Sequence, residues 1–156
     1  MAQQPVPGGL LEPVRQSVRV RRSVEAAFEL FTRDIGSWWP MGTHYARGDV
    51  VGVVFEGRPG GRIYERSRDG EVAEWGEVLA WEPPRRVVFS WLPNVGRGGP
   101  TEVEVRFTAE DPKTTRVELE HRGWERLGDL GAQTRSRYLN GWPGVIRLFV
   151  EAAEAA

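Results

Sequence analysis

Two stretches in the last third of the chain alternate strictly between apolar and charged residues. In Glu102–Thr108, valine and phenylalanine alternate with glutamate and arginine. In Thr115–His121, threonine, valine, leucine and histidine alternate with arginine and glutamate. Successive side chains of a strand point to opposite faces, so each stretch predicts a strand with one face on a core and one in water. The turn at Asp111–Pro112 joins them, which constrains the chain to a fold built on an antiparallel sheet.

Five further segments have the composition of strands, and short turns separate most of them. Pro59-Gly60-Gly61 predicts a turn, Asp69-Gly70 predicts a hairpin, and Pro83-Pro84 ends a strand because proline cannot donate to the ladder. Short connections favour pairing between successive strands, so the last six strands are expected to form an antiparallel meander. The five further predicted strands are Val14–Val20, Val50–Glu56, Arg62–Arg66, Val72–Trp81 and Arg86–Trp91.

One helix is predicted on each side of the meander. Ser23 is a suitable N-cap, and apolar residues recur at helical spacing from Val24 to Ile35. Residues 124–134 predict a short helical turn and a loop. The terminal helix carries Pro143, and we expect it to begin before this proline and to kink there. Its apolar stripe consists of Tyr138, Trp142, Val145, Phe149 and Ala152.

The order of elements predicts an α+β fold in one domain. The chain has 156 residues, enough for one self-sufficient core over residues 14–156, and residues 1–13 are expected to be a flexible arm. The apolar face of the sheet needs a cover, and the terminal helix is the one long apolar helix available. We therefore expect a curved antiparallel sheet of about seven strands wrapped around that helix (β-α-α-β6-α), with a hollow between them.

Composition excludes several classes of function. There is no cysteine, which rules out disulfides, thiolate metal sites and a cysteine nucleophile. The net charge is −1, and the 21 basic residues, of which Lys113 is the one lysine, are interleaved with 22 acidic ones, so we expect no nucleic-acid partner. Hydrolase, nucleotide and metal motifs are absent, so no catalytic residue, cofactor or metal is predicted. The sequence shows no pattern typical of a signal peptide or a membrane span, so we expect a cytoplasmic location.

Seven tryptophans are the most unusual feature of the composition. Indoles combine a large apolar surface with one N–H donor, so they suit the walls of a cavity for a flat ligand. Ordinary core packing is the alternative for each of them. The candidate cavity residues are Trp38, Trp39, Tyr64, Trp75, Trp91, His121, Tyr138, Trp142 and Ile146.

Histidine offers the sharpest single candidate. His121 shares the apolar face of its strand, where it could bind a ligand or act as an acid or base. The alternative is a buried histidine that fixes the strand end through a satisfied hydrogen bond, which we favour. His44 lies in a predicted loop and is expected at the surface.

Several segments resemble the START/Bet v 1-like (SRPBCC) helix-grip superfamily, and within it the bacterial relatives of the C-terminal domain of the Hsp90 ATPase activator. The resemblance covers about residues 14–153. Its matching segments are FTRDIGSWWP (31–40), VVFEGRPGGRIYER (53–66), WGEVLAWEPPRRVVFSW (75–91), TEVEVRFT (101–108), TTRVELEHRGWER (114–126) and NGWPGVIRLF (140–149).

The resemblance implies a fold more firmly than an activity. Its members include hydrophobic-ligand carriers, polyketide cyclases, resistance proteins that sequester antibiotics, and co-chaperones. We therefore expect a protein that binds a small hydrophobic or aromatic ligand, as a monomer or a homodimer. Two alternatives stay open: a cyclase or hydrolase using His121 with a tyrosine or carboxylate, and a protein that contacts an Hsp90-type chaperone. The loop at residues 92–100 looks shorter than in many members of the superfamily. Because such loops border the pocket there, the size of the pocket in this chain does not follow from the resemblance.

Overall fold

The computed structural model describes residues 11–40, 49–93 and 98–155. They form one seven-stranded antiparallel sheet in the order β1-β7-β6-β5-β4-β3-β2. The predicted meander is therefore confirmed, and the first strand of the chain is added at one edge of the sheet, where it pairs with the last strand. The strands are β1 Val14–Val20, β2 Val50–Phe55, β3 Arg62–Ser67, β4 Val72–Glu82, β5 Arg86–Trp91, β6 Thr101–Asp111 and β7 Thr114–Arg122.

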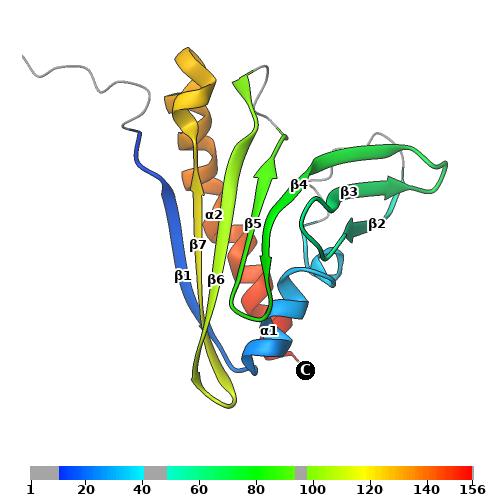
Figure 1. Cartoon of the computed structure of the whole chain (residues 1–156), viewed down its shortest axis with the longest axis vertical. Helices are drawn as coiled ribbons and strands as arrows, with labels where there is room; N and C mark the ends of the chain where they lie inside the picture. Colours follow the sequence, from blue (N-terminus) through cyan, green and yellow to red (C-terminus); the bar gives the residue numbers. More distant parts are fainter. Residues whose placement is uncertain (1–10, 41–48, 94–97, 156) are drawn as a thin grey trace, which may run out of the picture.

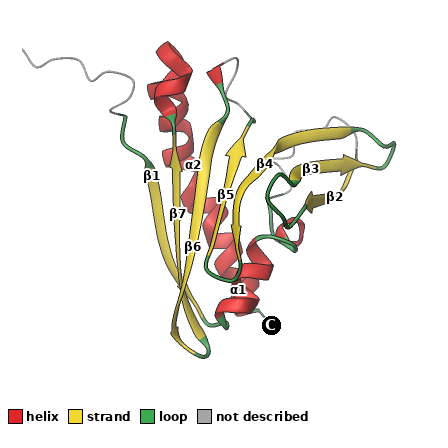
Figure 2. Ribbon diagram, in the orientation of Figure 1, coloured by secondary structure: helices red, strands yellow, loops and turns green. Residues whose placement is uncertain are grey.

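Helices cover one face of this sheet. Figures 1 and 2 show the long helix α2, Gly131–Glu154, running behind the sheet across its concave side. The shorter α1, Val24–Phe31, lies beside one end of α2, and the 3₁₀ turns are η2, Ile35–Ser37, and η5, Trp124–Leu130. This is the expected α+β helix-grip arrangement, with the core between sheet and helices.

Strand β4 bends the sheet through two irregularities in its pairing. Ile63 of β3 pairs with Gly76 and Tyr64 pairs with Glu74, which leaves Trp75 as an extra residue in β4. The pairing of β4 with β5 shifts again between Val78 and Ala80. An extra residue in one strand increases local bending and twist. Figure 1 shows the result, because the part of β4 that pairs with β3 turns away from the part that pairs with β5.

The same irregularities explain which β4 side chains face the core. Trp75, Val78 and Trp81 are three residues apart, which in a regular strand would place them on alternating faces. Trp75 and Val78 are nevertheless both buried in the core, and Trp81 packs against it. One extra residue in each interval restores the shared face.

Two expectations about helices are wrong in detail. Helix α1 ends at Phe31 and does not continue to Ile35, because the backbone leaves the helical region at Thr32, whose N–H and hydroxyl both donate to the carbonyl of Phe28. Ile35 starts the separate turn η2. At the other end, α2 begins at Gly131, inside the segment where we expected a loop. The expected start of this helix before Pro143 is confirmed.

Some expectations fall on residues that the structure does not describe. These are most of the arm at residues 1–13, the loop that contains His44, and the middle of the loop at residues 92–100. Within the described ranges, no helix is long and apolar enough to cross a lipid bilayer.

Candidate functional site: an aromatic cluster between sheet and helix

Trp39 lies at the centre of a cluster of aromatic rings in the core. Its ring centroid is 4.6 Å from that of Trp75, 5.8 Å from that of Trp91 and 6.2 Å from that of Trp142. The four indoles come from four parts of the fold: the segment after η2, strand β4, strand β5 and helix α2. None of the four side chains is more than 5% exposed. The cluster is therefore the point where sheet and helices meet.

Most of the indole N–H groups at the cluster have defined acceptors. Trp38 donates to the backbone carbonyl of Leu30 at 2.8 Å. Trp91 donates to the hydroxyl of Tyr138 at 2.8 Å, and that hydroxyl donates to the carbonyl of Pro93 at 3.0 Å. The first bond joins α1 to the residue that follows η2, and the other two join α2 to β5 and to Pro93 just after it.

His121 lies at the centre of a second set of hydrogen bonds. Its Nδ1 accepts from Nε1 of Trp142 at 3.0 Å, and its Nε2 lies 2.8 Å from Oγ1 of Thr101. An indole nitrogen can only donate, so Nδ1 of His121 carries no proton and the neutral ring carries its proton on Nε2. Nε2 then donates to Thr101, whose hydroxyl in turn reaches the carbonyl of Trp91 at 3.4 Å.

Burial lowers the pKa of His121 to about 3. The ring is fully buried and packs 4.3 Å from the ring of Trp124 and 4.8 Å from that of Tyr138, measured between centroids. Both ring nitrogens are already engaged, so the imidazole has no free position for a substrate proton. The structure thus places His121 in the role of a satisfied buried histidine at the end of β7.

Eight of the nine predicted site residues come together in this region, and Tyr64 does not. On β3, Ile63 and Glu65 are buried, so the intervening Tyr64 lies on the opposite face. There the guanidinium of Arg62 lies 4.8 Å from the centre of the Tyr64 ring. The eight residues in the core region are Trp38, Trp39, Trp75, Trp91, His121, Tyr138, Trp142 and Ile146.

Sequence reasoning missed two buried polar residues beside the cluster. Glu65 is fully buried, and its carboxylate accepts from Nε1 of Trp75 at 3.0 Å. Ser67 is also buried and follows on the same face of β3. The available signal was the period of the strand, because Ile63 as a core residue places positions 65 and 67 on the core side.

Three buried side-chain polar atoms of the described residues have no hydrogen-bond partner. They are Nε1 of Trp39, Oγ of Ser67 and Nε1 of Trp124. Buried polar groups are satisfied in the large majority of cases, so each exception calls for a physical explanation.

Four hollows that the described residues outline lie at the surface, and none is lined by the indoles around Trp39. The first, of about 370 Å³, lies on the outer face of β1, β6 and β7, and includes Glu104 and Arg106 in its lining. No group of three or more metal-ligating side chains occurs among the residues described. The predicted hollow between sheet and helix therefore stays a prediction.

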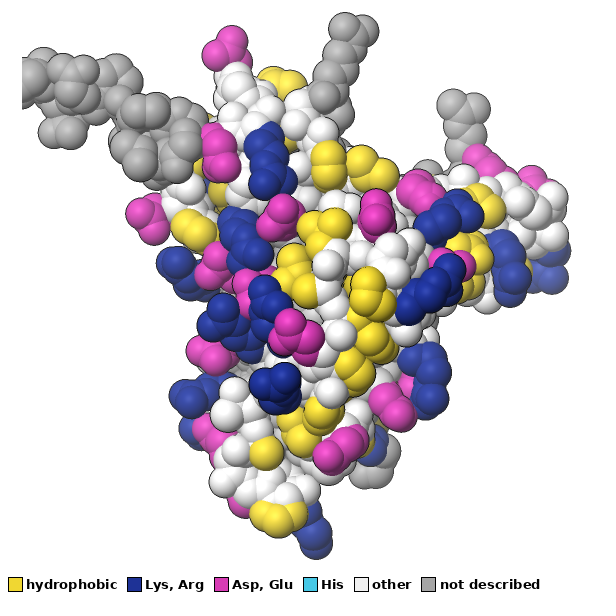
Figure 3. Space-filling view, viewed as in Figure 1, with side chains coloured by type: hydrophobic (Ala, Val, Ile, Leu, Met, Phe, Trp, Pro, Cys, Tyr) yellow, Lys and Arg dark blue, Asp and Glu magenta, His cyan; other side chains and the backbone are white. Residues whose placement is uncertain are grey.

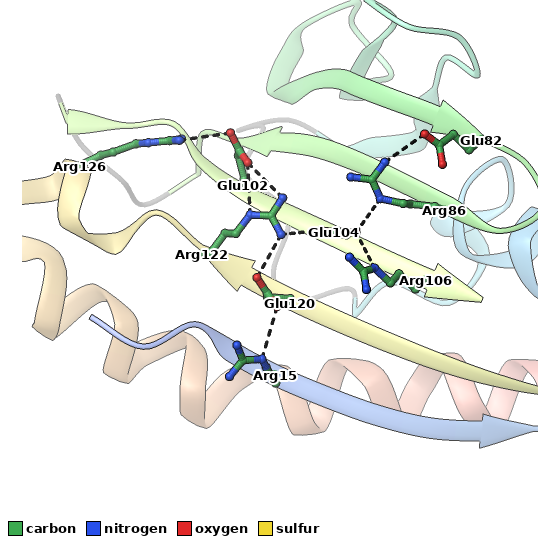
Figure 4. Close-up of polar contacts among 9 residues, drawn as sticks. All are labelled: Arg15, Glu82, Arg86, Glu102, Glu104, Arg106, Glu120, Arg122 and Arg126. Carbon is green, nitrogen blue, oxygen red and sulfur yellow. Dashed lines mark hydrogen bonds and ion pairs between the residues drawn. The ribbon is translucent and has the colours of Figure 1, made fainter. Parts of the chain in front are cut away.

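The outer face of the sheet carries a network of ion pairs centred on Glu104 (Figure 4). Its carboxylate contacts guanidinium groups of Arg86 and Arg122 at 2.6 Å and of Arg106 at 2.7 Å. Burial alone would raise the pKa of Glu104, but the hydrogen bonds from the three arginines outweigh it and lower that pKa to about 2. Figure 3 shows acidic and basic side chains interspersed over β1, β7 and β6 on this face.

Comparison with protein families gives a match over most of the chain. The family model described as "Activator of Hsp90 ATPase homolog 1-like protein" matches residues 21–154. A comparison with curated protein sequences finds no match.

Solved structures add relatives of several kinds. An anthrahydroquino-γ-pyrone synthase, Txn09, is 37% identical, with 86% of this chain and 90% of that chain covered and a TM-score of 0.55. CalC, a self-sacrificing resistance protein from Micromonospora echinospora, is 28% identical over 91% of this chain and 94% of that one, with a TM-score of 0.68. An Hsp90 activator from Plasmodium falciparum is 18% identical over 71% and 72%, with a TM-score of 0.51.

Proposed function

Because this chain belongs to the Activator of Hsp90 ATPase homolog 1-like family, we propose that it binds a small, flat aromatic molecule at the indole cluster between sheet and helix. The observation that carries the proposal is the convergence of Trp39, Trp75, Trp91 and Trp142 from four separate parts of the fold. The likeness to Txn09, whose described product contains fused aromatic rings, supports the same class of ligand.

The packing of the cluster suits an aromatic guest on energetic grounds. Aromatic pairs contribute about 0.5–1.5 kcal/mol beyond the burial of their surface. When a planar ligand enters beside Trp39, this indole exchanges ring contacts with Trp75 or Trp91 for ring contacts with the ligand. The energetic cost of opening the cluster is therefore largely offset. The remaining cost of opening lowers the apparent affinity, because only the opened fraction of the protein binds.

Catalysis is a second candidate, favoured by Glu65. A fully buried carboxylate beside the indole cluster is a group that can take or deliver a proton, and the synthase relative is an enzyme. His121 and Tyr138, which we considered for this role from sequence, are already engaged in hydrogen bonds. A catalytic reading therefore assigns proton transfer to Glu65, and Glu65→Gln would abolish turnover while leaving ligand binding measurable.

Contact with a chaperone stays a prediction from the resemblance. The likeness to the Plasmodium activator, at 18% identity, shows the fold alone. The site on this chain that carries chemistry is the aromatic core, which lies on the inner side of the sheet.

The direct test of ligand binding is thermal unfolding against a set of planar aromatic compounds, followed by calorimetric titration of the hits. A ligand that binds the folded state at 100 times its Kd stabilises that state by about 2.7 kcal/mol, so the Tm rises with ligand concentration. Trp39→Ala is expected to abolish the rise. Trp81→Ala is the matched control, since that indole packs with Phe28 and Phe55 away from Trp39. If no compound in the set raises the Tm or releases heat, the proposal fails.

A further inference from the structure

The polar atoms around the cluster specify more than an aromatic ligand. Resting on the proposed function, we infer that the ligand is an aromatic carbonyl compound whose oxygen accepts a hydrogen bond from Nε1 of Trp39. The carbonyl end of the ligand lies at the side of the cluster formed by Trp39, Glu65 and Ser67. The hydrocarbon part of the ligand lies against Trp75 and Trp91.

The first step is the unpaired indole of Trp39. Its side chain is 5% exposed, and its Nε1 has no partner. An unsatisfied buried donor destabilises the folded state, and a bound acceptor removes that cost. An indole N–H donates and cannot accept, so the group that completes it carries an oxygen or nitrogen lone pair. A plain aromatic hydrocarbon would leave the cost in place.

The second step is the clustering of polar groups on one side of Trp39. The rings of Trp39 and Trp75 are 4.6 Å apart, and the indole nitrogen of Trp75 lies 3.0 Å from the carboxylate of Glu65. Ser67 follows Glu65 on the buried face of β3, and its hydroxyl is the second unpaired polar atom. Trp39 thus connects to Glu65 through Trp75, and Ser67 lies two residues beyond Glu65 on the same face of β3.

The third step is the contrast with the opposite side of the cluster. There Nε1 of Trp142 and both nitrogens of His121 are satisfied, and the hydroxyl of Tyr138 both accepts and donates. These groups offer nothing further to a carbonyl oxygen. The side with Trp39 and Ser67 keeps two unpaired polar atoms, whereas near His121 and Tyr138 the one unpaired side-chain atom of the described residues is Nε1 of Trp124.

Trp124 supplies an internal control. Its Nε1 is also buried and unpaired, but its ring packs on His121 and Tyr138, and it comes from η5. The proposal assigns the ligand oxygen to Trp39 and not to Trp124. Phenylalanine at either position removes one buried indole donor and keeps an aromatic ring.

Two probes of similar size test the inference: naphthalene, a hydrocarbon, and chromone, which has the same bicyclic outline and one ring carbonyl. One hydrogen bond to a buried donor corresponds to roughly a tenfold difference in Kd, so chromone is expected to bind about tenfold more tightly. In ¹H–¹⁵N spectra of the wild-type protein, chromone is expected to move the Trp39 indole proton downfield, the direction of hydrogen-bond formation. Naphthalene causes ring-current shifts without that displacement, and the Trp142 indole proton serves as the reference.

The variants make the assignment specific. Trp39→Phe is expected to bring the ratio of the two Kd values close to one, whereas Trp124→Phe leaves it near ten. The ratio cancels any loss of ring contact, because both probes suffer it equally. If Trp39→Phe does not fold, the wild-type spectra decide the question without it.

The outcomes separate the two proposals. If neither probe binds, the proposed function fails and the inference fails with it. If both bind with equal Kd values, or if the ratio persists in Trp39→Phe, the aromatic site stands and the carbonyl assignment is overturned. The Trp39 indole proton could also prove to be hydrogen-bonded already in the free protein and unmoved by chromone. That result would show that a buried water accepts the hydrogen bond from this donor, and it would overturn the carbonyl assignment.

Discussion

The imidazole of His121 contributes to how stability depends on pH. The unfolded histidine titrates near pH 6.5, whereas burial lowers the folded pKa to about 3. Between these values the unfolded state binds more protons, so the free energy of unfolding falls as the pH falls. Its slope is expected to reach about 1.4 kcal/mol per pH unit. The contribution is fully present above pH 6.5 and is lost as the pH falls toward 3.

Urea unfolding between pH 7.5 and 4.5 measures this slope before most carboxylates titrate. His121→Asn is expected to be less stable at pH 7.5 and to show a much flatter pH dependence. His44→Asn, which changes the other histidine of the chain, is the control. A His121→Asn protein with the wild-type slope would contradict the assignment.

Trp142 is packed core, and its truncation is expected to be costly. The indole is 2% exposed, contacts the rings of Trp39 and Trp91, and donates to His121. Trp142→Ala leaves a cavity and an unpaired Nδ1, so we expect a loss of about 3–5 kcal/mol in urea unfolding. Leu139→Ala, on the exposed side of the same helix, is expected to change stability by less than about 0.5 kcal/mol. A small loss at Trp142 would indicate an open cavity there.

Residue patterns predicted most of the side chains that gather in the aromatic cluster, and β3 shows why they could not predict all of them. In Arg62–Ser67 an aliphatic residue and an aromatic residue occupy opposite faces. Alternation alone does not say which face is the core, so Tyr64 was chosen and Glu65 was passed over. Glu65 is tolerated in the core because Trp75 donates to its carboxylate. That contact joins two strands and is invisible in either strand alone.

At the scale of elements, the bend in β4 depends on a glycine. A Cβ built on Gly76 would lie 1.9 Å from the carbonyl oxygen of Ser90, which is backbone and cannot swing aside. Gly76→Ala must therefore separate β4 from β5 next to Trp75, and we expect a loss of at least about 2 kcal/mol in urea unfolding. Gly52→Ala in β2 is the matched control, because a Cβ there meets nothing within 4 Å. Equal stability of the two variants would show that the close approach is not rigid.

Strands and helices were predictable from the spacing of apolar residues where that spacing agrees with the contacts made in the folded protein. Alternation gave β6 and β7 correctly except at their ends, because pairing extends each strand beyond its apolar residues. The end of α1 was wrong because apolar spacing continues to Ile35, while the backbone leaves the helical region already at Thr32. The start of the terminal helix before Pro143 was correct, since α2 begins at Gly131 and includes that proline.

At the scale of the whole molecule, Glu104 connects strands across the outer face. Its side chain is 6% exposed and contacts three arginines on β5, β6 and β7. Glu104→Gln leaves these cations close together without their central anion. The arginines keep partial access to water, so we expect a loss of about 1–2 kcal/mol, smaller than for a fully buried pair. Glu120→Gln, at a more exposed member of the network, is expected to cost less than about 0.5 kcal/mol.

Chemical denaturation at low and high salt checks the same network. The loss of unfolding free energy in Glu104→Gln is expected to change little between 0.05 and 0.5 M NaCl. Dissolved ions screen exposed charges over a Debye length of roughly 10 Å at 0.1 M, but they screen a buried carboxylate only weakly. A loss that vanishes in high salt would place Glu104 among ordinary surface charges.

The hydrogen bonds from Trp142 through His121 and Thr101 to the carbonyl of Trp91 also fix how α2 is turned about its own axis. A shift of one residue along the helix rotates it by about 100°, which would carry the indole away from the imidazole. Apolar contacts of α2 would tolerate such a shift better than the hydrogen bond between the nitrogen atoms of Trp142 and His121, because apolar contacts are less directional. The bonds therefore fix the rotation of α2 about its axis. They select one register of α2 on the sheet among several that would bury a similar apolar area.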